Sequence, residues 1–331
     1  MRSRRASRPG RKQLRRIDVF NGDADGLCAL HQLRLAEPAT SELVTGVKRD
    51  IALLARVAAA PGDLVTVLDV SLERNRAALL GLLERGVRVR YFDHHHAGEI
   101  PSHPGLEASI DDSGGICTSM LVDRHLGGRF RAWAVAAAFG DGLDQAALNL
   151  GASMALGAAE LEKLRDLGRS LNYNAYGETE DDVLVPPARL YGVLARYQDP
   201  LRFIAEHGLA RRLDAGRHAD LAAVAEIEPH WTGPGGEVYV LPDEPWSRRV
   251  SGTFANQLAR QHARRAFAVL APGRGGGYIV SVRAPAGARL GAHEFCSGFP
   301  GGGGRREAAG IDRLPAAELA PFVRRFAHAF G

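Results

Sequence analysis

The strongest constraint on the fold is a pattern that recurs in the first third of the chain, where short apolar segments end in acidic or histidine residues. Residues 64–68 run into Asp69, and residues 87–92 run into Asp93 and the three histidines that follow it. A segment with helical spacing, 72–84, lies between them. Strands that alternate with helices favour a mainly parallel sheet, whose ligands gather beyond the carboxyl ends of the strands. The sequence therefore predicts an α/β domain with its functional side chains at one edge of the sheet.

The same pattern opens the chain, where a strand at 16–20 is followed by the turn Asn21–Gly26 and then by a helix. Asp23 and Asp25 are separated by one residue, so this turn can direct both carboxylates at one point. A turn that only caps a helix needs one aspartate, and the second one therefore favours a metal site.

Further candidate ligands follow the other strands. Histidine and aspartate are common ligands of divalent metals, and His94, His95 and His96 stand together at a strand end. Consecutive buried histidines without a metal would leave several polar groups in need of partners. Asp141, between two glycines after the helical segment 132–139, would by itself be a turn residue. Beside the other carboxylates we interpret it as a further ligand.

A second, smaller α/β domain is expected at residues 236–331, after a first domain at 17–209. The connection, 210–235, begins as a helix and becomes rich in proline and glycine. We expect a cleft between the two domains. The predicted elements of the second domain are strands at 237–241, 266–270 and 278–282 and a helix that Ser251 caps.

The second domain also contains a candidate phosphate site. A glycine run ahead of a helix offers backbone N–H groups and the helix dipole to an anion, and an arginine adds positive charge. A flexible linker is the alternative, but the sequence after the glycines looks helical. The candidate substrate-binding residues are Arg283, Gly301, Gly302, Gly303, Gly304 and Arg305.

Two other segments are interpreted from local pattern alone. Residues 50–59 are predicted to form a helix, and the acidic segment 177–182 is predicted to be solvated surface in preference to another metal site.

The positive charge of the chain is concentrated at its N-terminus. The formal net charge is +4, yet residues 1–16 are rich in arginine and contain no acid. Such an arm is expected to be disordered and could hold a nucleic acid electrostatically. A solvated tail without a specific partner is the alternative.

Composition excludes several other classes of protein. The three cysteines are widely spaced and form no CxxC pair, so neither a disulfide framework nor a thiolate zinc site is indicated. No apolar stretch is long enough to cross a membrane, and the N-terminus lacks the apolar core of a secretory signal. We therefore expect a cytoplasmic protein with no membrane partner.

Taken in order, these motifs resemble those of the DHH/DHHA1 phosphoesterases over nearly the whole chain from Ile17 onward. Asn21–Gly26 resembles the first motif of that family, Asp69 the second, Asp93 with the next two histidines the third, and Asp141 the fourth. Residues 280–283 and 301–310 resemble the substrate-binding motifs of its C-terminal DHHA1 domain, which holds the nucleotide.

The resemblance implies a hydrolase that uses two Mn²⁺ (or Mg²⁺) ions. Asp69 would bridge the ions, and Asp69, His94 and His95 would be the catalytic residues. Asp93 would orient a histidine without binding metal itself. The implied metal ligands are Asp23, Asp25, Asp69, His94, His95 and Asp141.

The chain departs from the family pattern at two places. Val19 and Asn21 stand where the family commonly has a histidine or an additional aspartate, and an amide oxygen binds manganese more weakly than a carboxylate does. Arg305 stands where the family usually has a histidine. Arginine can contact a phosphate but cannot shuttle a proton at neutral pH.

The length of the chain resembles that of the nanoRNase/oligoribonuclease and pAp-phosphatase group, which favours short oligonucleotides or small nucleotides as substrates. A single-strand-specific exonuclease of RecJ type, a catalytically weakened nucleotide-binding regulatory protein and an inorganic pyrophosphatase are the alternatives. The sequence leaves open the choice among RNA, DNA, pAp and cyclic dinucleotides. It also leaves the oligomeric state open, a homodimer included.

Overall fold

The computed structural model describes residues 14–331, so residues 1–13 of the basic arm lie outside the described part. Arg15 and Arg16, which the sequence assigned to the arm, belong to the folded domain. Arg16 begins the first strand, and Arg15 forms ion pairs with Asp63 and Glu42.

The first domain is built on a five-stranded sheet with the order β2-β1-β3-β4-β5, in which every neighbouring pair is parallel. The predicted parallel α/β domain is thus confirmed. Because β1, β3 and β4 are neighbours, their carboxyl ends meet at one edge. The strands are β1 (Arg16–Asn21), β2 (Glu42–Gly46), β3 (Leu64–Leu68), β4 (Arg88–Asp93) and β5 (Leu106–Ile110).

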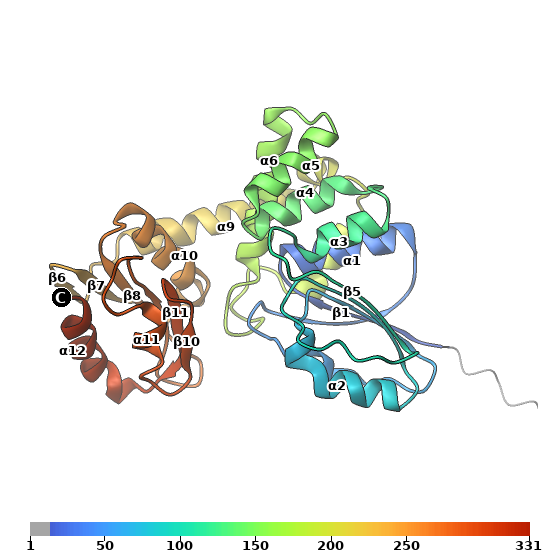
Figure 1. Ribbon diagram of the computed structural model, residues 1–331. Helices are drawn as coiled ribbons and strands as arrows, with labels where there is room; N and C mark the ends of the chain where they lie inside the picture. Colours follow the sequence, from blue (N-terminus) through green and yellow to red (C-terminus); the bar gives the residue numbers. More distant parts are fainter. Residues whose placement is uncertain (1–13) are drawn as a thin grey trace, which may run out of the picture.

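Helices cover both faces of this sheet (Figure 1). Ile17 and Val19 of β1 join the core beneath α2, whereas Phe20 joins the core beneath α1, as the alternation of side chains along a strand requires. The helices next to the sheet are α1 (Ala24–Ala36), α2 (Leu72–Glu84) and α3 (Thr118–His125).

The predicted helix at 50–59 is wrong, because only a short 3₁₀ helix, η1 (Leu53–Arg56), forms there. The side chain of Asn75 in α2 accepts a hydrogen bond from the Leu54 N–H at 3.2 Å and donates one to the Ile51 carbonyl at 2.7 Å. These backbone groups are therefore satisfied by a side chain from another helix, and the segment stays irregular.

A layer of helices continues the first domain, and α9 runs from this layer to the second domain (Figure 1). No helix of residues 14–331 is both long and apolar enough to cross a membrane. The helices of this layer, with α9, are α4 (Arg131–Gly140), α5 (Asp144–Ser153), α6 (Ala158–Asn174), α7 (Pro187–Leu194), α8 (Pro200–Glu206) and α9 (Gly208–Ala225).

The second domain has a six-stranded sheet with the order β10-β11-β9-β8-β7-β6, antiparallel except for the pair β7 and β8. Helix α10 packs on one face, and α11 and α12 pack on the other. The prediction that Ser251 caps α10 is wrong, because Ser251 lies inside this helix. The elements are β6 (Trp231–Gly233), β7 (Gly236–Val240), α10 (Pro245–Gln261), β8 (Ala266–Pro272), β9 (Tyr278–Arg283), α11 (Ala292–Cys296), β10 (Gly302–Gly304), β11 (Ala308–Leu314) and α12 (Leu319–Phe330), with a 3₁₀ turn η2 (Ala316–Glu318).

The acidic segment 177–182 joins the two domains, so its prediction as solvated surface is wrong at its last residue. Asp182 is fully buried and forms ion pairs with Arg248 at 2.9 Å and Arg274 at 3.0 Å, both from the second domain. Its other oxygen accepts the N–H groups of Glu178 and Thr179, which folds the segment back on itself. The loop therefore presents one buried carboxylate to two guanidinium groups.

Candidate metal centre

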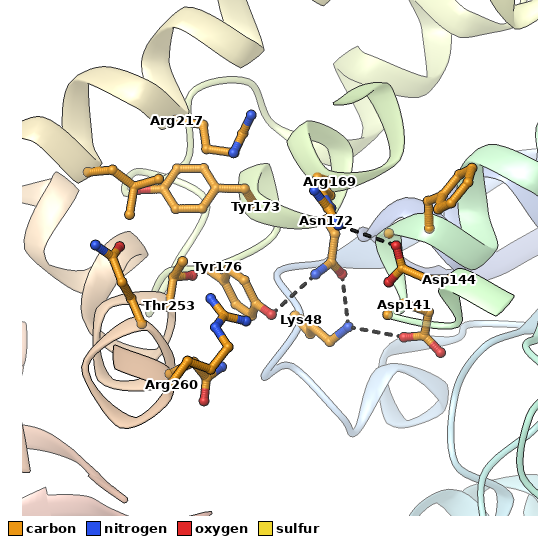
Figure 2. Close-up of a pocket in the computed structure, with 16 residues that line it drawn as sticks. Lys48, Asp141, Asp144, Arg169, Asn172, Tyr173, Tyr176, Arg217, Thr253 and Arg260 are labelled. Atoms are coloured by element: carbon orange, nitrogen blue, oxygen red, sulfur yellow. Dashed lines mark hydrogen bonds and ion pairs between the residues drawn. The ribbon is translucent and has the colours of Figure 1, made fainter. Parts of the chain in front are cut away.

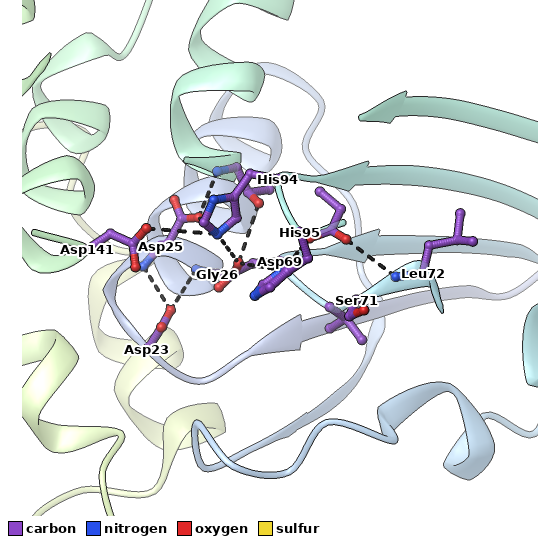
Figure 3. Close-up of polar contacts among 12 residues, drawn as sticks. Asp23, Asp25, Gly26, Asp69, Ser71, Leu72, His94, His95 and Asp141 are labelled. Carbon is purple, nitrogen blue, oxygen red and sulfur yellow. Dashed lines mark hydrogen bonds and ion pairs between the residues drawn. The ribbon is translucent and has the colours of Figure 1, made fainter. Parts of the chain in front are cut away.

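The candidate ligands meet at the carboxyl edge of the first sheet, as the parallel topology requires (Figure 3). Asp69 follows β3, and His94 and His95 follow β4. Ligand atoms of these three residues all lie within 4.8 Å of one another. The order of the strands thus brings together residues from separate parts of the chain.

His94 is the centre of this cluster. Its Nδ1 lies 3.0 Å from the carbonyl oxygen of Ile116, which leaves Nε2 facing the carboxylates. Nε2 is 3.3 Å from Asp69 Oδ1, 3.8 Å from Asp141 Oδ2 and 3.9 Å from Asp25 Oδ2. An ion about 2.1 Å from each ligand separates neighbouring ligand atoms by about 3 to 4 Å. Each of the three carboxylates therefore lies within ligand-to-ligand range of His94 Nε2, and Asp69, His94 and His95 together have the mutual spacing of a divalent-cation site.

Local structure fixes the aspartates of this set. The carboxylate of Asp25 accepts the N–H groups of Thr118 and Ser119, both at 2.7 Å, at the start of α3. Asp69 adopts a φ of 58°, a region that non-glycine residues rarely occupy, and its N–H bonds the Phe92 carbonyl at 3.0 Å. Such strain is found where surrounding structure enforces it, often at functional sites.

The remaining members of the Asp-His-His-His run have distinct surroundings. Asp93 is fully buried, accepts the Leu72 N–H at 3.4 Å and lies 2.7 Å from Nδ1 of His95. It thus orients His95, the contact expected of it, and leaves His95 Nε2 for another ligand. His96 is exposed, and its Nδ1 lies 2.9 Å from Asp112 Oδ2, outside the cluster.

The site carries an excess of negative charge. Burial, with the charges of Asp23 and Asp25, raises the pKa of Asp69 well above its ordinary value. Burial also raises the pKa of Asp25, and together with the charge of Asp25 it raises the pKa of Asp141 to about 6. Asp23 is the exception: burial would raise its pKa, but the Lys48 ammonium lowers it. A bound divalent cation would supply the missing positive charge.

Lys48 is a site residue that our sequence analysis missed. Its Nζ lies 2.6 Å from Asp23 Oδ2. It also lies 3.0 Å from Asn172 Oδ1 and 3.7 Å from Asp141 Oδ1 (Figure 2). Lys48 follows β2, so it stands at the same edge of the sheet as the ligands. The available signal was a cation just after residues 43–47, whose composition is typical of a strand.

A cavity of about 560 Å³ adjoins the cluster and lies between the two domains (Figure 2). At the end next to the cluster, the cavity is lined by Asp141, which is itself a candidate ligand, and by Lys48. Arg169 of α6, Arg217 of α9 and Arg260 of α10 line the rest, together with polar residues. The predicted cleft is therefore present, and positive side chains from both domains line it. Our sequence analysis named none of these arginines.

The structure places the predicted phosphate residues of the second domain apart from this cavity. Arg283 donates to Asn256 Oδ1 at 2.6 Å and lines a neighbouring cavity, which shares Asn256 and Arg260 with the first. None of residues 301–305 lines either of these cavities. Arg49, next to Lys48, reaches Asp312 of β11 at 3.4 Å, and the Asp312 N–H donates to the Gly301 carbonyl. The glycine segment thus lies close to the first domain, but its contact with substrate stays a prediction.

The helix predicted after the glycine run is wrong. Gly302–Gly304 form strand β10, and Arg305 begins a tight turn into β11, in which the N–H of Arg305 bonds the Ala308 carbonyl. A Cβ atom at Gly302 would collide with the carbonyl oxygen of Cys296 in α11. Close packing of β10 on α11 therefore requires glycine here, and the glycine run leads into β11 and not into the N-terminus of a helix.

Comparisons with known proteins find similar structures but no similar sequences. No protein-family model and no curated protein matches the sequence. A structure of exonuclease RecJ bound to manganese is similar with a TM-score of 0.65 and 21% identity, over 96% of this chain and 91% of that chain. RecJ of Thermus thermophilus in complex with Mn²⁺ has a TM-score of 0.61 and 21% identity, over 96% of this chain and 53% of that chain. The same enzyme in complex with Mg²⁺ has a TM-score of 0.52 and 19% identity, over 96% of this chain and 50% of that chain. The chain therefore has the fold of the RecJ exonuclease and spans about half the length of the Thermus protein.

Proposed function

We propose that the protein is a metal-dependent phosphoesterase of the DHH/DHHA1 type, which hydrolyses phosphoester bonds of short oligonucleotides or small nucleotides. The observation that carries this proposal is the position of the basic cavity directly beside the ligand cluster. Metal ligands without such a cavity would suit a structural ion equally well. The RecJ fold, together with the Mn²⁺ and Mg²⁺ of the RecJ complexes, supports a divalent cation in this role.

The cavity suits a compact anionic substrate. Its volume of about 560 Å³ lies within the range of roughly 300–1,000 Å³ typical of small-molecule pockets. Arg169, Arg217 and Arg260 can each bind a phosphate oxygen, and guanidinium groups suit this task because they donate in a planar fork. A long strand would need a continuous groove, whereas a volume of this size suits a substrate of one or a few nucleotides.

The residues of the cluster would divide the reaction among them. Asp25, Asp69, His94 and Asp141 would hold the divalent cation, which stabilises negative charge on the reacting phosphoryl group. His95, held by Asp93, would present Nε2 to the cation or to a phosphate oxygen. In the hydrolysis a water oxygen bonds phosphorus, the bond from phosphorus to the ester oxygen breaks, and the departing oxygen takes up a proton that the water loses. Lys48 and the arginines would keep the phosphate beside the cation.

A substrate series tests the proposed substrate class. Rates with Mn²⁺ are compared for a dinucleotide, a 24-mer single strand, 3'-phosphoadenosine 5'-phosphate, a cyclic dinucleotide and pyrophosphate. We expect the fastest cleavage on one of the short nucleotides. Faster cleavage of the 24-mer per chain would contradict the proposal and favour a RecJ-type exonuclease.

The RecJ-type exonuclease is the second candidate, because the fold is that of RecJ and the basic arm can add nonspecific affinity for a strand. Removal of residues 1–13 separates the two activities. An exonuclease on long strands should lose rate and salt sensitivity on the 24-mer, whereas a short-substrate enzyme should keep its dinucleotide rate. Binding of nucleotides without any hydrolysis would instead point to a weakened regulatory protein.

A further inference from the structure

We infer that the protein binds one divalent cation, at Asp25, Asp69, His94 and Asp141, and that the ammonium group of Lys48 takes the place of the second cation that the DHH resemblance implies. This inference rests on the proposed metal-dependent function and refines its metal site. It concerns how this chain balances the charge of its four site carboxylates.

The position of Lys48 carries the inference. Its Nζ is surrounded by three oxygens, those of Asp23 at 2.6 Å, Asn172 at 3.0 Å and Asp141 at 3.7 Å. Two of these oxygens, those of Asp23 and Asn172, accept hydrogen bonds from the ammonium group, and Asp141 adds an ion pair. Asp23 caps α1, Asn172 lies in α6 and Asp141 follows α4, and the contact therefore depends on the tertiary structure. Lys48 thus occupies a cation position that the fold builds.

Asp23 is already engaged through both of its oxygens. Oδ1 accepts the N–H groups of Asp25 at 3.0 Å and Gly26 at 3.2 Å, and Oδ2 accepts from Lys48. A second ion bound through Asp23 would therefore displace the ammonium or lie beside it, where two positive charges repel each other. The residue that the resemblance assigns to the metals instead caps α1 and pairs with lysine.

The two halves of the site differ in the ligands they offer. The first half has three carboxylates around His94 Nε2, at 3.3 to 3.9 Å. The second half has Asp23, which pairs with Lys48. Asn21, which the resemblance assigns to the same metal motif, has a buried Oδ1 with no hydrogen-bond partner among the described residues. A neutral amide oxygen is a weaker ligand for a hard cation than a carboxylate. The first half fits a divalent ion, whereas the second fits a lysine.

Metal stoichiometry tests the inference without any assay of activity. The full chain is saturated with Mn²⁺, freed of excess ion and measured by native mass spectrometry, and its electron paramagnetic resonance spectrum is recorded. We expect one Mn²⁺ per chain and the spectrum of an isolated ion. Two ions per chain of similar affinity, with the spectrum of an exchange-coupled pair, would overturn the inference.

Variants of Lys48 test its role directly. Lys48→Met should admit a second Mn²⁺, bound at least about ten-fold more weakly than the first, and Lys48→Met with Asn21→Asp should bind it more tightly. Lys48→Arg, which keeps the charge, should still bind one ion. Lys163→Met is the matched control, because Lys163 is an exposed lysine of α6, and it should bind one ion. If the Lys48→Met protein has the circular dichroism spectrum of a folded protein and still binds only one ion, the proposal that Lys48 takes the place of a second cation is contradicted.

The stoichiometry and the proposed function can fail separately. Two tightly bound ions in a protein that hydrolyses nucleotides would refute the role of Lys48 and leave the phosphoesterase intact. One bound ion in a protein that hydrolyses none of the phosphoesters would refute the proposed function and leave the charge replacement intact.

Discussion

Nε2 of His94 lies 3.3 Å from Oδ1 of Asp69, although the two residues follow different strands, β4 and β3. The carbonyl of Ile116 holds the other ring nitrogen of His94, so the direction of Nε2 is fixed before any ion binds. A ligand set that the fold pre-orients in this way binds a cation without first ordering its side chains. Loss of one of these ligands should therefore weaken metal binding and slow hydrolysis.

His94→Ala should lower hydrolysis by at least about 100-fold, because it removes the ligand that faces three carboxylates. His96→Ala is the matched control. It removes an exposed histidine of the same run and should leave the rate within about two-fold. Steady-state rates with Mn²⁺ distinguish the two. Equal losses in both variants would show that the run acts through folding and not through metal binding.

Mn²⁺ affinity should rise with pH between about 5 and 7, because burial and the charge of Asp25 raise the pKa of Asp141 to about 6. Below that pH a proton occupies the carboxylate and competes with the ion, so the affinity falls by up to about ten-fold per pH unit for this group. Calorimetric titrations of the apo-protein at several pH values measure the slope. Asp141→Asn should reduce the slope by about one proton, whereas Asp144→Asn, on the same cavity, should not. An unchanged slope in Asp141→Asn would refute this account.

Arg260→Gln should raise KM for a short nucleotide by about 10- to 100-fold with a smaller effect on kcat. A hydrogen bond to a charged group contributes about 1.5–3 kcal/mol, and Arg260 lines the proposed phosphate cavity. Arg264→Gln removes the same charge from a residue that lines a separate cavity of the second domain, and it should leave KM unchanged. A larger effect of Arg264→Gln would place the substrate elsewhere.

Asp182→Ala should lower the free energy of unfolding by about 2 kcal/mol, because it leaves Arg248 without its buried partner; Arg274 is partly exposed and adds less. Burial would raise the pKa of Asp182, but hydrogen bonds from Arg274 and Arg248 hold it at about 2. The stabilisation is therefore present above the unfolded pKa of about 4 and is lost as the pH falls towards 2. Urea unfolding measures the change.

Asp181→Ala is the control for this prediction, since Asp181 is exposed and its carboxylate pairs with Arg274. It should change the urea midpoint little. If both variants unfold like the wild type, the Asp182 ion pairs do not stabilise the junction of the two domains.

The sheet edge was predictable from the sequence because strand period and strand ends are local properties. Asp69 and His94 each follow a strand whose pattern is visible in the chain, and parallel topology then places them together. The contacts of Lys48 were not predictable in this way. Its partner Asn172 lies on a distant helix, and only tertiary packing brings the two residues together.

The errors of the sequence analysis arose where tertiary contacts override local pattern. The segment after Gly304 looks helical, but packing of β10 on α11 makes it a hairpin. Asp182 looks like one more exposed acid, yet two arginines of the second domain bury it. Arg248 and Arg274 are 66 and 92 residues from Asp182, whereas Cys296 is near Gly302 in sequence, but in neither case does local propensity report the contact.

The most direct test of the phosphoesterase proposal is hydrolysis of a dinucleotide by the full chain with Mn²⁺, with EDTA and as Asp69→Asn. Asparagine suits this variant because it tolerates the positive φ of residue 69 and keeps its size. We predict release of mononucleotide with Mn²⁺ and loss of at least about 100-fold in rate with EDTA or in Asp69→Asn. A rate that is the same in EDTA, or in a folded Asp69→Asn protein, would contradict the account.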